Sequence, residues 1–218
     1  MHPNAGQWDD RIEYKIDLSM GEMLIEKDGF TYFFSDGKQK HSHEHHGSVL
    51  SHDEDLIKSH VIQSKFVGSS WNGNTVVRDS SSFYRNYLQG SDRSKWKKKV
   101  HSYNSLRLPN YYQGIDLLLE GKEGALKYSL LVHPNVNADQ IKMTYSGHDS
   151  LFIDEDGNLH IRNRFCDIIE RAPIAWLDEN QRKVKVDFKL EGNTLSFDFP
   201  DGYDVSKTLI IDPTLTFS

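Results

Sequence analysis

The stretch Lys183–Leu190 (KVKVDFKL) decides the fold class of this sequence. Apolar and charged residues alternate along it, with valine, phenylalanine or leucine at every second position. A period of two is typical of a β-strand with one buried face and one solvated face. A similar alternation occurs at Arg11–Leu18, so the pattern belongs to the chain and not to one segment.

Short runs of the same kind are spread over the whole sequence. The further strands that they predict are Met23–Ile25, Phe30–Phe34, His60–Val67, Ile115–Leu119 and Asn193–Phe199. Turn residues separate them, often as Asp-Gly or Asn-Gly pairs, which adopt the positive φ angles of tight hairpins. Many short strands at this spacing predict an all-β protein of the antiparallel β-sandwich type. Helical signals predict only two single turns, at Arg93–Lys97 behind Asp92 and at Asn137–Ile141.

The length of 218 residues allows one large β-domain or two small ones. We expect one module over residues 1–218, or two related β-lobes at about 1–105 and 112–218. The second alternative rests on an internal echo. A strand, an Asp-Gly hairpin and another strand follow one another around Asp28-Gly29 and again around Asp156-Gly157.

The composition describes a polar, globular and acidic chain. Its formal net charge is −6 and its mean hydropathy −0.64, while aromatic residues make up 11% and argue against disorder. The acidic balance gives no general attraction to nucleic acid, which we do not expect as a partner. No stretch approaches the roughly 20 apolar residues of a membrane helix, so membrane insertion is not expected. The sequence begins without a signal peptide, and we expect that a targeting segment has been removed.

A histidine-rich segment, residues 36–58, is the most conspicuous candidate site and is predicted to be a long loop. Its clustered histidines are His41, His43, His45 and His46. Imidazole is a good ligand for Zn, Cu or Ni. A metalloprotease motif would need a second histidine where Gly47 stands, so no catalytic metal is predicted. Incidental metal affinity of a solvated loop and a non-catalytic metal or pH-responsive site both stay open, and no resident cofactor is predicted.

Four other features favour structural interpretations. The acidic run Asp154–Asn158 (DEDGN) lacks the ligand spacing of an EF-hand and predicts a hairpin turn. The basic run Lys95–Lys99 predicts a solvated turn, and the polar segment 67–82 predicts a second long loop. Cys166 is the single cysteine, so no internal disulfide forms, and we expect it to be a small buried residue.

Two sets of residues could bind or process a glycan. Sugar rings stack on flat apolar faces with polar rims. The aromatic residues that could form such a platform are Trp71, Tyr84, Tyr111 and Tyr112. The carboxylates that could form a glycosidase pair are Asp116, Glu120, Glu170 and Asp212. Such a pair must converge at about 5–10 Å, and no hydrolase, phosphate-loop or dinucleotide motif is present, so we assign no catalytic residue.

Several spaced motifs resemble one family over essentially the whole chain. They are Pro3–Asp9 (PNAGQWD), Phe83–Trp96 (FYRNYLQGSDRSKW), Tyr112–Leu117 (YQGIDL), Leu126–Tyr128 (LKY), Asp156–Leu159 (DGNL) and Leu209–Pro213 (LIIDP). They are similar to the uncharacterised N-terminal domain of large secreted proteins of Bacteroidetes-type bacteria. Those proteins often carry SBBP β-propeller repeats, PKD-like modules and a gliding-motility or type IX secretion signal. The resemblance implies export and downstream domains in the same polypeptide, and it implies no catalytic or binding residue.

Three functions remain as hypotheses. The leading one is a non-catalytic structural or interaction module of a secreted or cell-surface multidomain protein, in adhesion, with its own downstream domains or a surface protein as partner. The second is a carbohydrate-binding module that takes an extracellular glycan on the aromatic platform. The third is a glycan-active enzyme with paired carboxylates. The family resemblance and the missing catalytic motifs favour the first.

Overall fold

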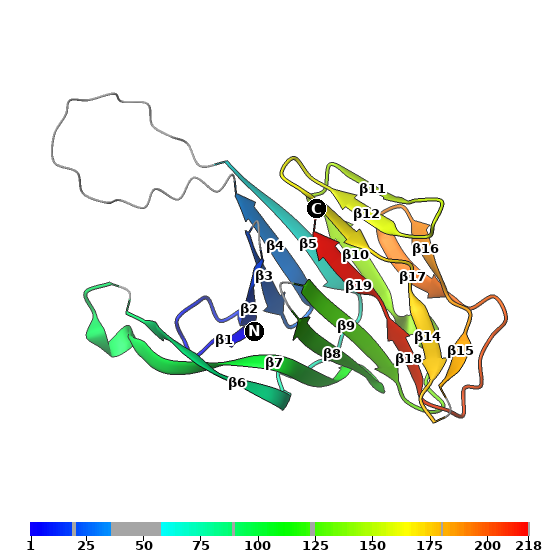
Figure 1. Cartoon of the computed structure of the whole chain (residues 1–218), viewed down its shortest axis with the longest axis horizontal. Coiled ribbons are helices and arrows are strands. Elements are labelled where there is room, and N and C mark those ends of the chain that lie inside the picture. The colour runs from blue at the N-terminus through cyan, green and yellow to red at the C-terminus, as the bar shows by residue number, and fades with distance from the viewer. Residues whose placement is uncertain (19–20, 36–57, 89, 123–124, 180, 218) are drawn as a thin grey trace.

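The structure is a computed structural model of two antiparallel sheets that pack face to face (Figure 1). It describes residues 1–18, 21–35, 58–88, 90–122, 125–179 and 181–217. Outside the sheets, the described residues form two single turns of 3-10 helix, η1 (Arg93–Lys95) and η2 (Ala138–Gln140). The predicted all-β class and sandwich type are confirmed.

The first sheet has eight strands in the order β1-β2-β3-β4-β5-β10-β17-β16. Their bounds are β1 His2–Pro3, β2 Ile12–Leu18, β3 Gly21–Glu26, β4 Gly29–Ser35, β5 Ser59–Phe66, β10 Lys142–Ser146, β16 Asp187–Glu191 and β17 Thr194–Asp198. Strands from both halves of the sequence therefore meet in this sheet, at the pairing of β5 with β10.

The second sheet has eleven strands and branches at β9. The bounds are β6 Val76–Tyr87, β7 Lys97–Tyr112, β8 Ile115–Lys122, β9 Ala125–Val132, β11 Ser150–Ile153, β12 Leu159–Arg162, β13 Asp167–Glu170, β14 Ile174–Leu177, β15 Arg182–Val184, β18 Leu209–Asp212 and β19 Thr214–Phe217. β8 pairs with one edge of β9, while β18 and β19 share the other. β6 and β7 follow outward from β8, so β6 lies at an edge of the sheet.

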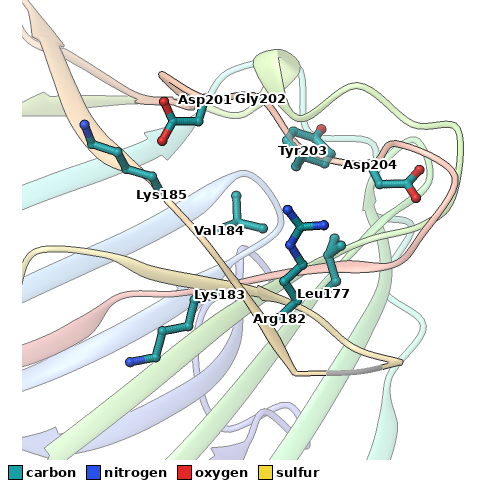
Figure 2. Close-up of a pocket in the computed structure, with 9 residues that line it drawn as sticks. All are labelled: Leu177, Arg182, Lys183, Val184, Lys185, Asp201, Gly202, Tyr203 and Asp204. Carbon is teal, nitrogen blue, oxygen red and sulfur yellow. The ribbon is translucent and has the colours of Figure 1, made fainter.

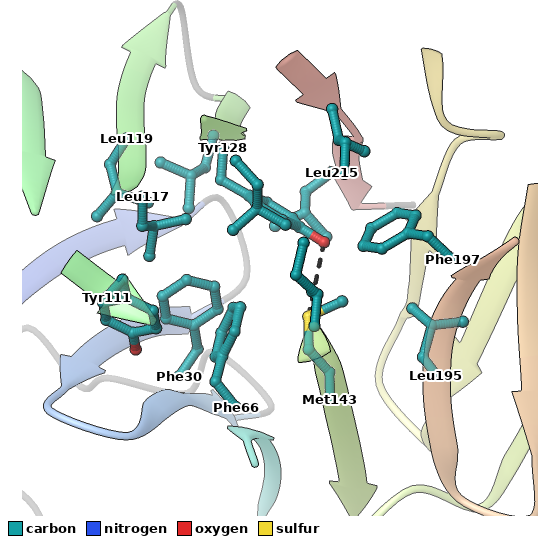
Figure 3. Close-up of a cluster of buried hydrophobic side chains, with 14 of the residues drawn as sticks. Phe30, Phe66, Tyr111, Leu117, Leu119, Tyr128, Met143, Leu195, Phe197 and Leu215 are labelled. Atoms are coloured by element: carbon teal, nitrogen blue, oxygen red, sulfur yellow. Dashed lines mark hydrogen bonds between the residues drawn. The ribbon is translucent and has the colours of Figure 1, made fainter. Parts of the chain in front are cut away.

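Aromatic and aliphatic side chains fill the space between the sheets as one cluster (Figure 3). The Phe66 ring of the first sheet lies 5.1 Å from Phe30 and 5.0 Å from Tyr111 of the second sheet, measured between ring centroids. The Tyr128 hydroxyl also reaches the sulfur of Met143 across the gap, at 3.9 Å. Burying so many large side chains together is the main contribution to the stability of this fold.

The two-lobe alternative finds no boundary in this structure. Residues 105–112, where the lobes would be joined, lie inside the single strand β7. Both sheets combine strands from the two halves, and the buried residues form one cluster. The two Asp-Gly hairpins of the internal echo, β3–β4 and β11–β12, lie in different sheets of one sandwich.

The stretch Lys183–Leu190 forms two strands and not the single strand that its alternation predicts. β15 ends at Val184 in the second sheet, and β16 begins at Asp187 in the first. Val186 and Phe188 are buried and Val184 is half-buried, so the alternation continues across the change of sheet. Both sheets face the same core, and a period of two cannot distinguish one long strand from two short strands that share it.

Most of the remaining local predictions are confirmed, and one is wrong. The two helical turns are confirmed, with Asp92 and Asn137 accepting hydrogen bonds from backbone N–H groups of η1 and η2. Cys166 is buried as expected. The loop predicted at 67–82 is wrong in its second half, because β6 begins at Val76. This strand is exposed along its length and so has no apolar alternation by which a sequence would reveal it.

Candidate interaction surface and the predicted site residues

Glu170 lies at the end of β13 and points into the core, where it is 1% exposed. Its carboxylate oxygens accept hydrogen bonds from the hydroxyls of Tyr128 at 2.9 Å and Tyr145 at 2.6 Å. Burial raises the pKa of Glu170, and the two hydroxyl donors oppose that change only in part. Tyr145 belongs to the first sheet and Tyr128 to the second, so this carboxyl joins the sheets from inside the core.

Asp116 lies on β8 and points away from the core, yet it is only 2% exposed. Its oxygens accept hydrogen bonds from the Asn110 backbone N–H at 2.7 Å, from Arg107 Nε at 2.7 Å and from His133 Nε2 at 3.1 Å. Burial opposes ionisation, but these donors outweigh it and hold the pKa of Asp116 below its ordinary value. Asp116 therefore fixes the turn between β7 and β8 and the start of the segment after β9.

Asp212 and Glu120 lie on the same outward face as Asp116. The Asp212 carboxylate is engaged by the Lys127 ammonium at 2.6 Å and the Ser129 hydroxyl at 3.0 Å. Glu120 is half-buried and faces a cavity of about 420 Å³ that Asp79 and Lys127 also line. Lys127 therefore stands between the Glu120 cavity and the buried carboxylate of Asp212.

The four carboxylates do not converge. Glu170 points into the core, whereas the other three point out of the opposite face of the second sheet. Asp116 is opposite Leu131 of β9, and the register of β18 places Asp212 beside Ser129 on the other edge. Strand spacing and rise then put the Cα atoms of Asp116 and Asp212 roughly 12 Å apart. Asp116 pairs with Arg107, and Asp212 pairs with Lys127. Among the described residues, no cavity that the structure shows joins these two carboxylates.

Replacing Asp116 by asparagine tests this structural role. We expect the free energy of unfolding at pH 7 to fall by about 1–3 kcal/mol, because charge-assisted hydrogen bonds to a buried carboxylate are weakened. A carboxyl with a lowered folded pKa stabilises the fold above its unfolded pKa, near 4, and this stabilisation is lost as the pH falls. The difference in unfolding free energy between wild type and variant, measured by urea unfolding, should therefore become smaller from neutral pH toward pH ~3. A gap that is independent of pH would contradict the assignment.

The predicted aromatic platform is not formed. Trp71, Tyr111 and Tyr112 are 5%, 0% and 1% exposed; the two tyrosine rings pack beside Phe66, and the Trp71 ring packs beside Tyr111. The prediction that these three share an exposed surface is wrong, because β7 carries both tyrosines into the core at its end. Tyr84 is 51% exposed and lies on β6.

The metal-binding predictions have two outcomes. His41, His43, His45 and His46 lie outside the described residues. The acidic run Asp154–Asn158 is a hairpin turn between β11 and β12, as predicted, and the Asp154 carboxylate accepts N–H groups of Asp156, Asn158 and His160. Among the residues that the structure describes, no group of three or more His, Cys, Asp or Glu is placed to hold a metal ion.

A cavity of about 470 Å³ opens beside β15 (Figure 2). Cationic and anionic side chains line it together: Lys185 lies near Asp201, and Arg182 points toward Tyr203 and Asp204. A neighbouring cavity of about 310 Å³ lies along Lys183–Val186 and is lined largely by apolar residues such as Ile174. Neither cavity contains a residue that the sequence predicted for a site.

The hairpin of β6 and β7 extends beyond the sandwich (Figure 1). β6 pairs with β7 on one side, and no strand of the described residues pairs with its other side. Nine large apolar side chains are exposed in the described chain, and five of them lie on or just after β6: Val76, Val77, Phe83, Tyr84 and Leu88. We call residues 76–88 and 90–101 the hairpin surface. Phe83, at 78% exposed, is its most accessible apolar side chain.

Residues 1–17 support one face of the hairpin and leave the other open. The Trp8 ring packs edge-on against Tyr87 at 5.4 Å, and Arg85 pairs with Asp17 at 2.7 Å. Arg85 is opposite Val100, which is buried on this supported face. Because side chains alternate along a strand, Tyr84 and its partner His101 lie on the open face, with their rings 5.8 Å apart.

The tip of the hairpin is an ordered turn. Asp92 accepts N–H and hydroxyl bonds from Ser94, and the Trp96 indole N–H donates to the Gly90 carbonyl at 3.2 Å. The Arg93 guanidinium lies over the Trp96 ring, 5.4 Å from its centroid. Asp92, Ser94 and Trp96 of the motif Phe83–Trp96 therefore have structural uses at this tip.

The hairpin surface is basic in an acidic protein. It contains seven lysines and arginines and two aspartates, whereas the whole chain has a formal net charge of −6. The sequence prediction missed this surface, because it assigned Lys95–Lys99 to a solvated turn and 67–82 to a loop. The usable signal was the combination of Phe83-Tyr84 with these nearby cations, in a segment with no apolar alternation.

None of the described residues forms a helix with the length and apolar character needed to cross a membrane. The geometry thus defines an all-β domain of two large antiparallel sheets with a projecting basic hairpin. The family described as "Domain of unknown function (DUF7948)" matches residues 1–214, so the chain belongs to this family. No curated protein and no solved structure matches the chain.

Proposed function

We propose that this domain is a non-catalytic interaction module of a secreted or cell-surface multidomain protein and that it binds a partner through the hairpin surface. The observation that carries the proposal is the gathering of exposed Val76, Val77, Phe83, Tyr84 and Leu88 on one supported, projecting element. Five large apolar side chains that are 42–78% exposed within one stretch of 13 residues indicate more than isolated surface residues, and interfaces are enriched in aromatic residues and arginine.

The support from residues 1–17 strengthens this proposal. An unsupported two-stranded hairpin is marginally stable in water, so it would pay an ordering cost on binding. Here Trp8 packs on Tyr87, and the Tyr103 N–H donates to the Met1 carbonyl at 2.8 Å, which attaches the hairpin to the sandwich. The open face is thereby preorganised for a partner.

The secreted location and the multidomain context belong to the same proposal. They are motivated by the resemblance of Pro3–Asp9 and the other spaced motifs to N-terminal domains of large exported proteins. Adhesion would follow from an exported module with a protein-binding surface. The carbohydrate-binding alternative keeps a single exposed member of its platform, Tyr84.

Site-specific photo-crosslinking tests the proposal in the cells that make the protein. A photoreactive phenylalanine analogue replaces Phe83 in one variant and Val205, an apolar residue outside the hairpin surface that is 52% exposed, in the other. We expect a discrete protein adduct from position 83 and none from position 205. Absence of an adduct at 83, or the same adducts from both positions, would overturn the proposed interaction surface, and an adduct that a glycosidase removes would support the carbohydrate-binding alternative.

A further inference from the structure

Resting on the proposed function, we infer that the partner of the hairpin surface is an acidic polypeptide segment that also carries apolar side chains. The inference joins two properties of the same element. The net positive charge of the hairpin surface favours a partner with negative charge. Its exposed aliphatic side chains favour a polypeptide over other polymers.

Exposed cations give the hairpin surface its positive charge. Three lysines near the tip are exposed and have no ion-pair partner among the described residues: Lys95, Lys98 and Lys99. Arg85, in contrast, is paired with Asp17. The unpaired ammonium groups are exposed to solvent in the free protein and available to a carboxylate, and they belong to five consecutive residues, 95–99. An acidic partner is therefore attracted over the whole tip.

Exposed aliphatic side chains favour a polypeptide over other polyanions as the partner. Val76, Val77 and Leu88 are aliphatic and between 42% and 50% exposed, and they lie before and after Phe83 and Tyr84 on β6 or just beyond its end. Sugars and bases stack on aromatic faces, and an aliphatic side chain offers them no such face. Apolar side chains of a protein partner can contact both the aliphatic and the aromatic residues of the hairpin surface. The rest of the chain is more negative than the −6 of the whole chain. It would therefore repel a long glycan or nucleic acid polyanion that extends beyond the hairpin surface.

Side chains rather than a new strand pairing carry this contact. The pairing of β6 with β7 shifts register between Val77 and Asp79 and again between Ser80 and Tyr84. Such bulges twist an edge strand, and charged residues such as Arg78 block regular addition of a further strand. The partner segment therefore contacts side chains of the hairpin surface and does not extend the sheet along the edge of β6.

Three peptides of about 12 residues, which is the length needed to span β6 as an extended chain, test the inference. They share the same leucine and tyrosine positions and carry glutamate, serine or lysine at the remaining ones. Binding is followed by backbone amide NMR of the whole domain. We expect the glutamate peptide to bind at least about tenfold more tightly than the serine peptide, to shift amides of residues 76–101, and to weaken several-fold on raising salt from about 50 to 300 mM.

Matched charge reversals supply the control. Lys95→Glu with Lys98→Glu should abolish the preference for the glutamate peptide, whereas Lys183→Glu with Lys185→Glu changes the net charge equally and should leave it intact. Equal binding of all three peptides, or loss of the preference for the glutamate peptide in both double variants, would overturn the inference. Tighter binding of a uronic-acid polysaccharide at the same amides would overturn it as well. A protein adduct at position 83 would still uphold the proposed function in each of these cases, so the two failures are distinguishable.

Discussion

A Glu170→Leu variant is expected to lose about 3–5 kcal/mol of unfolding free energy, the largest single effect that we predict for a polar residue. The carboxyl is 1% exposed and is the acceptor for both Tyr128 and Tyr145. Without it, both hydroxyls stay buried and lose a carboxylate acceptor; Tyr145 keeps the Ser64 hydroxyl and Tyr128 keeps the Met143 sulfur as a weaker partner. Chemical denaturation at neutral pH, with far-UV circular dichroism as the readout, measures the loss.

Removing the tyrosine hydroxyls separates the polar contribution from packing. In the triple variant Glu170→Leu, Tyr128→Phe, Tyr145→Phe, no hydroxyl is left without a partner, so we expect most of the lost stability to return. The same two Tyr→Phe changes in wild type should destabilise, because they remove the donors and leave the carboxyl buried. A triple variant as unstable as Glu170→Leu alone would mean that the loss comes from packing and that the hydrogen bonds are minor.

The pH dependence of Glu170 has the opposite sign to that of Asp116. Burial raises the folded pKa of Glu170, so its contribution is fully present below the unfolded pKa, about 4.3, and is lost as the pH rises through the folded value. Glu170→Gln mimics the neutral carboxyl and should lack this loss. The stability of wild type relative to Glu170→Gln should therefore fall as the pH rises, whereas that of wild type relative to Asp116→Asn should increase.

The parts of the fold that the sequence predicted are those where one face of a strand is buried. The strands around Ile16, Ile25 and Phe34 alternate because they lie between core and solvent, and the structure forms them as β2, β3 and β4. Sheet membership is a different matter. Val184 and Phe188 obey one alternation but belong to different sheets, because the alternation records the side of the core and not the identity of the sheet.

The candidate site was harder to predict for the converse reason. Tyr111 and Tyr112 have the composition of a sugar platform, yet position at the end of β7 buries them, and local sequence does not encode that depth. β6 has no buried face, so nothing in its pattern indicates a strand. Its Phe83 could be recognised as a surface residue only when the pairing of β6 with β7 was known.

The same substitution at two phenylalanines should therefore have opposite consequences. Phe66→Ala removes a ring that is 2% exposed and packs against Phe30 and Tyr111, and we expect a loss of about 3–5 kcal/mol from the cavity and the lost transfer energy. Phe83→Ala removes a ring that is 78% exposed, and we expect a change within about 0.5 kcal/mol. Urea unfolding of the two variants beside wild type measures both.

The comparison also decides how Phe83 is to be understood. If Phe83→Ala leaves stability unchanged, folding gains nothing from placing a large apolar ring in water, and the cost in solubility must be offset by another use of the ring. Loss of the crosslinked partner in a Phe83→Ala protein of full stability would then identify binding as that use. A loss above about 2 kcal/mol would instead show that the ring is packed in solution, and Phe83 would no longer be available to a partner.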